Sequence, residues 1–457
     1  MRISTDALHP LHLAALLATL WLTACGGLPE RTDYAAAAKA DVAGVSAWSA
    51  LDVGTPSAHL DELIRSPELD ALVAEALTAN PDLQQTLLTL EILRAEQRRT
   101  GAARLPSLEA GLAGDKGEDA GTSYTGSLTL GWELDLWRKL SDEYRAAGLD
   151  VAEQQALYES ARDTLAAEVM QTWLGLIADW HAVAIERRRL ATLAKNEQFI
   201  IQRYRNGLGT LEDLASARTS TASSRANLES YEESLAQHER QLRGLLGRTD
   251  AAPIATLADY PEVGLPLAEM PAQTLARRPD LRAAYLAIEA ADLRTSVAYK
   301  DLLPRIDLQA ALTDVARSPG EALLSDPVWS LLAQLTAPLY QGGRLRAAVE
   351  VAKLKTAQAY QAYRETLVDA VTQVGDALGQ ERSLAKQQTH ITTALAAARN
   401  NLAQYQRSYR TGLVDILDLL SVQQSTYDLE AQLDELRFQR LDNRIALGLA
   451  LGLGVSE

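Results

Sequence analysis

The sequence predicts a mixed α and β protein in which membrane-type β-hairpins are continued by very long helices, and in which this unit occurs twice. The prediction rests on an internal repeat, on two long regions without proline, and on segments that alternate between apolar and polar residues. In the repeat, Asn80–Leu83 returns as Arg278–Leu281, and Tyr204–Leu208 returns as Tyr409–Leu413. An offset of about 200 residues is far too long for a solenoid, so it indicates a duplicated domain.

The first residues predict export from the cytoplasm. The apolar run Leu11–Leu22 is too short to span a bilayer but suits the core of a secretory signal. Cys25, the single cysteine of the chain, follows at once. The segment Leu22–Gly26 resembles the lipobox of bacterial lipoproteins, which implies a signal peptide over 1–24, a lipidated Cys25 and an outer-membrane address. The alternative is an ordinary signal peptide with an incidental cysteine.

Composition excludes several classes of protein. The net charge of −16 and a pI near 5.0 argue against a nucleic-acid partner, which needs basic clusters. A hydrophobic content of 47% excludes a disordered chain. Beyond Cys25 no apolar run approaches the roughly 20 residues of a membrane-spanning helix, so a helical membrane protein is excluded.

Four segments have the period-two pattern of β-strands. The even positions from Tyr124 to Leu136 are apolar, aromatic or glycine, with polar residues or glycine between them, and Trp329–Leu339 repeats the pattern. Shorter alternations run over 108–112 and 306–312, so one hairpin is expected at about 107–137 and another at about 305–340. A half-buried soluble sheet is the alternative for any one segment. Four of them, paired by duplication, favour a membrane sheet.

A membrane sheet of four strands cannot close by itself. Unpaired strand edges do not occur in lipid, and the smallest single-chain barrels have about eight strands. Several chains must therefore share one barrel. Two chains would give a lumen filled by side chains, whereas three would leave room for an open channel. The sequence therefore favours three chains.

Long helices are expected where proline is missing, between Pro106 and Pro253 and after Pro338. Proline costs about 3 kcal/mol or more inside a helix, so these regions permit unbroken helices. The expected helices cover 138–205, 211–247, 343–409 and 414–450, and the longer ones would approach 100 Å at 1.5 Å per residue. A soluble coiled coil is the alternative on helix periodicity alone.

Four motifs carry a resemblance to a known family. They are Trp132–Arg138, Ala337–Leu345, Arg203–Gly207 and Tyr409–Gly412. Together they resemble the outer membrane factor family of TolC-like channel-tunnels, and most closely its lipidated NodT-type branch. The resemblance implies a homotrimer with a twelve-stranded barrel in the outer membrane, a helical tunnel in the periplasm and an equatorial belt built from residues near 28–66, from 253–271 and from the C-terminus.

The domain boundaries follow from this comparison. Residues 25–66 form a lipidated N-terminal segment, 67–252 a first repeat, 253–270 a linker and 271–457 a second repeat. The family's members are passive exit ducts of tripartite efflux systems. The expected partners are therefore a periplasmic adaptor, or membrane fusion protein, and an inner-membrane pump of the resistance-nodulation-division type.

The resemblance also implies a gate at the periplasmic tip. By motif position, Asp418 and Leu417 match constriction residues, and Asp213 with Tyr409 matches a pair whose hydrogen bond helps to close the tip. Other charged side chains are expected as possible tip contacts: Asp415, Arg203, Arg407 and Arg410. The alternative for these charges is that they are solvated side chains at helix ends.

An enzyme is not expected. The histidines after the signal, His59, His181, His238 and His390, are scattered without metal-ligand spacing, and no catalytic or nucleotide-binding motif occurs. We therefore expect no catalytic residue, no metal and no cofactor. Two alternatives to efflux remain: a duct for type I protein secretion, and a periplasmic coiled-coil lipoprotein scaffold that forms no channel.

Overall fold

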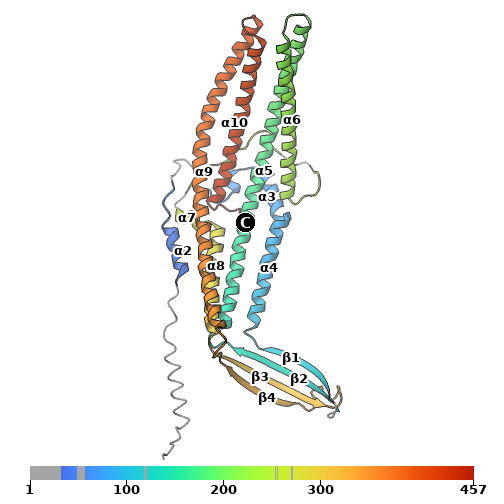
Figure 1. The fold of residues 1–457 in the computed structure, drawn as a ribbon, viewed down its shortest axis with the longest axis vertical. Coiled ribbons are helices and arrows are strands. Elements are labelled where there is room, and N and C mark those ends of the chain that lie inside the picture. The colour runs from blue at the N-terminus through green and yellow to red at the C-terminus, as the bar shows by residue number, and fades with distance from the viewer. Residues whose placement is uncertain are drawn as a thin grey trace, which may run out of the picture.

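The computed structural model describes residues 32–48, 57–117, 121–252, 254, 256–268 and 271–456. The signal segment and Cys25 lie outside the described residues. The described chain is a long rod, with helices along its axis and a β-sheet at one end (Figure 1). Within it, no helix combines the length and apolar character needed to cross a bilayer.

Two helix pairs of matching length form most of the rod. Helices α5 (Lys139–Arg205) and α9 (Arg344–Arg410) have 67 residues each, and α6 (Leu211–Leu245) and α10 (Ile416–Ala450) have 35 each. Each begins and ends within two residues of the prediction. The equal lengths carry the sequence repeat into the structure.

Several shorter helices begin at proline. Proline suits the first helical position because an N–H there would have no partner within the helix, so the helix loses no hydrogen bond. Ser66 caps α3 through the amide of Leu69, and Asn80 caps α4 through the amides of Asp82 and Leu83. Four helices start this way: α3 (Pro67–Ala79), α4 (Pro81–Ala102), α7 (Pro271–Arg277) and α8 (Pro279–Lys300). The described N-terminal region adds α2 (Tyr34–Ala43) and the short η1 (Asp61–Leu63).

The sheet has four antiparallel strands in the order β1-β2-β3-β4. Their bounds are β1 (Ser107–Gly117), β2 (Gly121–Leu134), β3 (Arg305–Ala316) and β4 (Val328–Thr336). Each repeat supplies one hairpin, and β2 of the first pairs with β3 of the second. Strands β1 and β4 therefore form the two open edges of the sheet.

The register places the apolar positions on one face. Leu130 lies opposite Leu108 on one side and Ala310 on the other, and Ala310 lies opposite Leu331. Partners in an antiparallel pair share a face, so these four residues form one row across the sheet. Leu331 is 71% exposed in the chain. This face has the apolar surface that lipid contact requires.

One polar residue on the apolar face has a specific use. Asp314 is 7% exposed, and its carboxylate accepts a hydrogen bond from the amide of Asp326 at 3.0 Å. The loop between β3 and β4 thus folds back onto the sheet. Ala322 of that loop is fully buried against Gly126, where a Cβ atom would overlap its carbonyl oxygen.

The strands end earlier than the alternation predicts, because the chain turns into the helices. Asp135 is not a strand residue: its carboxylate accepts hydrogen bonds from the amides of Leu140 and Ser141 at 2.9 and 2.8 Å. The sharp turn puts Arg138 at φ 59°. In the second repeat Gly343 occupies the matching place at φ 84°, without the steric cost that a side chain brings.

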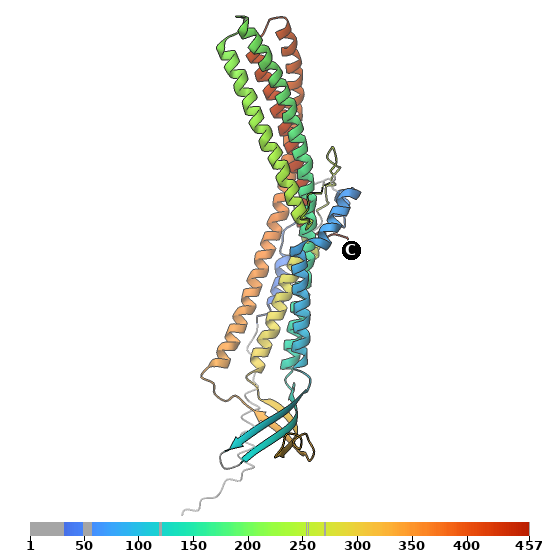
Figure 2. The ribbon, with the colours of Figure 1, turned by 90° about the vertical axis from the view of Figure 1, so that its right-hand side faces the viewer.

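A core half-way along the rod joins the helices to the expected belt. Trp173 of α5 is fully buried there, within the largest apolar cluster of the described residues. The amide of Leu60 donates to Gly454 at 2.9 Å, and the amide of Gly264 donates to Leu63 at 2.8 Å. Segments from the N-terminal region, the linker and the C-terminus therefore meet, and both views place the C-terminus at mid-length (Figures 1 and 2).

Candidate gate at the helix tips

Both helical hairpins turn at the end of the rod that lies opposite the sheet. Gly207 at φ 71° and Gly412 at φ 76° take the left-handed conformation that ends α5 and α9. In each turn the next amide reaches back: Leu208 donates to the carbonyl of Arg203, and Leu413 donates to that of Ser408, both at 2.9 Å. The two tips therefore share one backbone design.

Asp213 belongs to the start of α6. Its carboxylate accepts a hydrogen bond from the amide of Thr210 at 2.9 Å, and its own amide donates to the Thr210 hydroxyl at 3.1 Å. This reciprocal capping box satisfies two backbone donors that a helix start leaves unpaired. Asp213 thus has a structural use within its own chain.

Tyr409 does not bond to Asp213 within the chain. Its hydroxyl is buried and has no hydrogen-bond partner among the residues that the structure describes. Its ring packs edge-on against Phe199, with 6.3 Å between the ring centroids. The predicted hydrogen bond between Asp213 and Tyr409 is therefore not formed inside one subunit, and it stays a prediction for contacts between subunits.

Of the three residues predicted at the second tip, two make contacts within the chain and the third is exposed. Asp415 caps α10 by accepting from the amide of Ile416, and Leu417 packs against an apolar cluster that includes Ile200. Asp418 is exposed and forms no ion pair within the described parts of the chain. Its place in the first turn of α10 is electrostatically favourable for a carboxylate. Asp418 is therefore an exposed tip acid with no cation paired to it in the described structure.

Two of the three predicted tip arginines contact backbone rather than acids. Arg203 donates to the carbonyl of Leu208 at 2.9 Å, and Arg407 donates to that of Ala403 at 3.1 Å. Arg410 is exposed. None of the three pairs with a tip carboxylate in the described structure, so they remain candidates for contact with a partner.

A polar seam between α5 and α10 lies below the tips, and sequence reasoning did not find it. Asn196 donates to Gln423 at 2.8 Å, the hydroxyls of Thr192 and Tyr427 lie 3.0 Å apart, and Arg188 pairs with Glu430 at 2.9 Å. We define these pairs, together with Arg189 and Asp428, as the α5–α10 seam. Its partners stand more than 220 residues apart, so no local motif signals them.

Two of the histidines make structural contacts among the described residues. His181 lies between the carboxylate of Asp434 and the carbonyl of Ala258, each at 2.9 Å, and His238 contacts Asp179. No group of three or more metal-binding side chains comes together in the described part of the chain.

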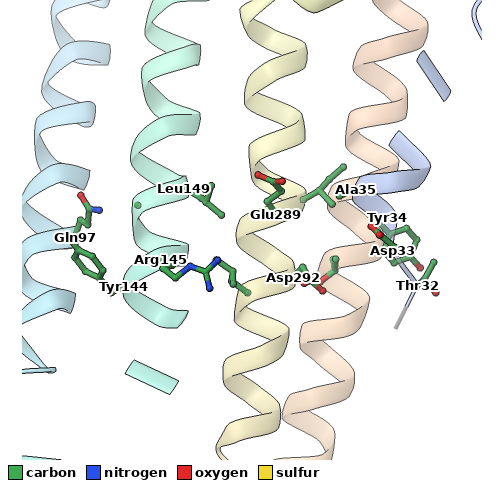
Figure 3. A pocket seen from close by; sticks show the side chains of 14 residues that line it. Thr32, Asp33, Tyr34, Ala35, Gln97, Tyr144, Arg145, Leu149, Glu289 and Asp292 are labelled. Carbon is green, nitrogen blue, oxygen red and sulfur yellow. The ribbon is translucent and has the colours of Figure 1, made fainter. Parts of the chain in front are cut away.

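A cavity of about 730 Å³ lies far from the tips, between α2 and the helices of the sheet-proximal half. Figure 3 shows Arg145 extending from α5 toward α8, which presents Glu289 and Asp292, while Asp33 comes from the start of α2. Asp33 is committed to the α2 cap, where it accepts from Ala36 at 2.9 Å.

Comparison with known proteins decides the family. A model of the outer membrane efflux protein family matches residues 72–248 and 270–453. The chain belongs to this family. Its location is the outer membrane, and its two matched stretches correspond to the two structural repeats.

Curated relatives and solved structures agree over nearly the whole chain. OprJ of Pseudomonas aeruginosa, an outer membrane protein, is 29% identical over 97% of this chain and 96% of its own length. CusC of Escherichia coli, a cation efflux system protein, is 26% identical over 85% and 87%. A membrane protein from Pseudomonas aeruginosa of known structure aligns with a TM-score of 0.81 at 28% identity, covering 89% of this chain and 99% of that one. The open state of the MtrE channel of Neisseria gonorrhoeae shares the fold, with a TM-score of 0.81 at 24% identity over 90% and 96%.

These findings confirm the TolC-like resemblance and the fold class. The relatives are named as channels and efflux proteins of the outer membrane, and none of those named here is an enzyme. Family membership makes this chain an outer membrane efflux protein.

Proposed function

We propose that the chain forms a homotrimeric channel-tunnel, the passive exit duct of a tripartite efflux system, gated at its periplasmic tip. The observation that carries the proposal is the four-stranded sheet with open edges at β1 and β4 and one continuous apolar face. Three copies joined edge to edge supply twelve strands, four from each chain. A closed barrel of this size leaves a lumen for solutes.

The tip supports contact with a periplasmic adaptor. Leu208, Leu211 and Leu413 are 67%, 66% and 78% exposed at the two turns. Apolar side chains grouped at one end of a rod favour a protein partner, and the arginines beside them add charge for orientation. We assign the energy for transport to an inner-membrane pump of the resistance-nodulation-division type, as the resemblance to the outer membrane factor family implies.

The gate is assigned chiefly to the second tip. Around a threefold axis, three Asp418 carboxylates would lie close together and attract cations. Leu417 of each copy adds an apolar constriction beside them. Asp213 with Tyr409 is proposed as a lock between neighbouring subunits, since the two groups do not bond within one.

The anchor is assigned to Cys25. More than one acyl chain on this residue holds a protein durably in a membrane, where a single chain gives marginal binding. Replacing Cys25 by Ala should abolish incorporation of labelled palmitate. Continued labelling of that variant would contradict the assignment.

Relatives of similar identity carry different cargo. CusC belongs to a cation efflux system, whereas OpmQ of Pseudomonas aeruginosa, 27% identical over 97% of each chain, exports pyoverdine. A passive duct need not recognise the molecules that pass through it, so we assign the selection of cargo to the pump.

Two measurements test the function. Purified protein in planar bilayers should conduct and should migrate as a heat-modifiable trimer, whereas a coiled-coil scaffold would extract as a lipoprotein without conducting. Deletion of the gene should raise sensitivity to small toxic compounds or metal cations. If deletion instead leaves these tolerances unchanged and abolishes export of one protein, the type I secretion alternative replaces efflux.

A further inference from the structure

The two helical hairpins of each chain meet along the α5–α10 seam. Figure 1 shows the pair α5 and α6 beside the pair α9 and α10 in the half of the rod that ends at the tips. An apolar cluster that includes Ile200 and Leu419 joins the helices near the turns, and the belt core joins them at mid-length. Between these clusters the seam is polar, so its strength depends on a few charges.

Glu430 joins three helices in this stretch. One carboxylate oxygen of Glu430, on α10, lies 2.9 Å from Arg188 of α5 and 3.5 Å from Arg399 of α9. The Glu430 side chain is only 20% exposed, although both arginines reach it from solvent. Removing its charge would leave two guanidinium groups facing each other across the seam.

Arg189 makes the second link. Its side chain is 14% exposed and pairs with Asp428 of α10, and its Nε lies 3.5 Å from the buried Glu186 of its own helix. Glu186 in turn accepts a hydrogen bond from Ser224 of α6 at 2.6 Å. The charge of Arg189 therefore ties α10 to both helices of the first hairpin.

The position of the seam gives it leverage on the tip. Arg188 stands 17 residues before the end of α5, or about 25 Å at 1.5 Å per residue. Polar contacts of this kind exchange readily with water and contribute little individually, unlike a packed apolar interface. Without the seam, the apolar cluster near the turns still joins the two hairpins at the tip, but the stretch between that cluster and the belt core loses its polar contacts.

We propose that Glu430, with Arg189, is a restraint that holds the two hairpins of each chain together and so sets the width of the tip. This inference rests on the proposed channel function. It is separate from Asp418, which acts on ions at the constriction, and from Tyr409, whose hydroxyl is unpaired within the chain.

The test compares two glutamates of one helix. Glu430→Gln removes the shared charge, whereas Glu435→Gln makes the same change at a side chain that accepts a hydrogen bond from Gln439 of its own helix. In planar bilayers, Glu430→Gln should spend roughly two- to fivefold more time in the high-conductance state, the range expected for one exposed ion pair. Glu435→Gln should match the wild type. Equal open times for all three proteins would overturn the inference.

A second measurement remains decisive if Glu430→Gln does not assemble. In a chain with Thr192→Cys and Tyr427→Cys, a short bifunctional thiol reagent that a reductant cleaves should link α5 to α10 across the seam. The positions suit this link because the hydroxyls of Thr192 and Tyr427 lie 3.0 Å apart. Linking should lower the open time and reductant should restore it. No response to linking would refute the restraint. A wild-type protein that never conducts would instead refute the channel function on which it rests.

Discussion

The side-chain amide of Asn80 donates a hydrogen bond to the carbonyl oxygen of Leu245 at 3.0 Å, 165 residues further along the chain. In the second repeat Arg278 takes the same place and donates to Ala450 at 3.1 Å. The residue before one helix thus caps the last turn of another, so that α6 abuts α4 and α10 abuts α8 (Figures 1 and 2). Duplication preserved this contact while the donor changed from an amide to a guanidinium.

Replacing Asn80 by Ala should destabilise the protein by about 1–2 kcal/mol, because it removes an N-cap and leaves a helix carbonyl unpaired. Asn80→Asp keeps the oxygen that caps α4 but loses the donor to Leu245. Thermal unfolding of the solubilised protein should therefore rank wild type above Asn80→Asp, and Asn80→Asp above Asn80→Ala. Equal melting temperatures for the two variants would mean that the contact with Leu245 contributes nothing.

Gly126 should not tolerate a side chain. A Cβ there would overlap the carbonyl of Ala322, so Gly126→Ala should push the loop between β3 and β4 off the sheet. Trypsin added to intact cells should then cleave faster at the exposed Arg317 of that loop. Gly131→Ala is the control, because its Cβ would lie 3.4 Å from the Ser107 hydroxyl, which can give way. Unchanged cleavage in Gly126→Ala would contradict the folded-back loop.

Asp163 should make stability depend on pH. Burial raises the pKa of this carboxyl, which is 9% exposed and accepts from the amide of Val455 at 3.0 Å. A folded-state pKa above the unfolded value means that the charged form penalises folding, and that the penalty fades as pH falls through the folded pKa. Asp163→Asn should therefore raise the melting temperature at pH 8, with the gain shrinking toward zero below about pH 4, near the ordinary pKa of aspartate. A gain that is the same at all pH values would rule out the carboxyl as its source.

Asp418 should control block by cations. Replacing it by Ala removes the proposed ring of three charges, so multivalent cations should block the single-channel current less strongly. Glu212→Ala is the matched change at the exposed tip of the first repeat and should leave block largely intact. If Glu212→Ala relieves block as well as Asp418→Ala does, the ring is not confined to the second tip.

Much of the fold was predictable because its signals are local. Proline-free regions with glycine at the turns predicted the long helices to within two residues. Alternation also predicted which face of each strand is apolar. Successive side chains point to opposite faces of a strand, so a shift of one residue would move the whole apolar set to the other face. The strand ends were less accurate, because Asp135 reads as an alternating polar position although it caps α5.

The gate was only partly predictable because it depends on distant partners. No motif near Glu430 in the sequence indicates that it pairs with Arg188. Arg188 lies 242 residues away and becomes a neighbour only when the two hairpins pack. The pairing of Asp213 with Tyr409 came from resemblance, and within one chain each has another environment. Asp314 interrupts the apolar face, and only the loop that covers it explains a carboxylate there.

The open edges at β1 and β4 also have a genetic consequence. A single chain cannot close a barrel, so its open strand edges pair with those of neighbouring copies. Membrane insertion and assembly therefore become one event that depends on the concentration of the chain. A variant that pairs normally through its strands but fails at its tip would enter complexes with normal chains. Such a variant should therefore be dominant over the wild-type allele, whereas one that cannot pair should be recessive.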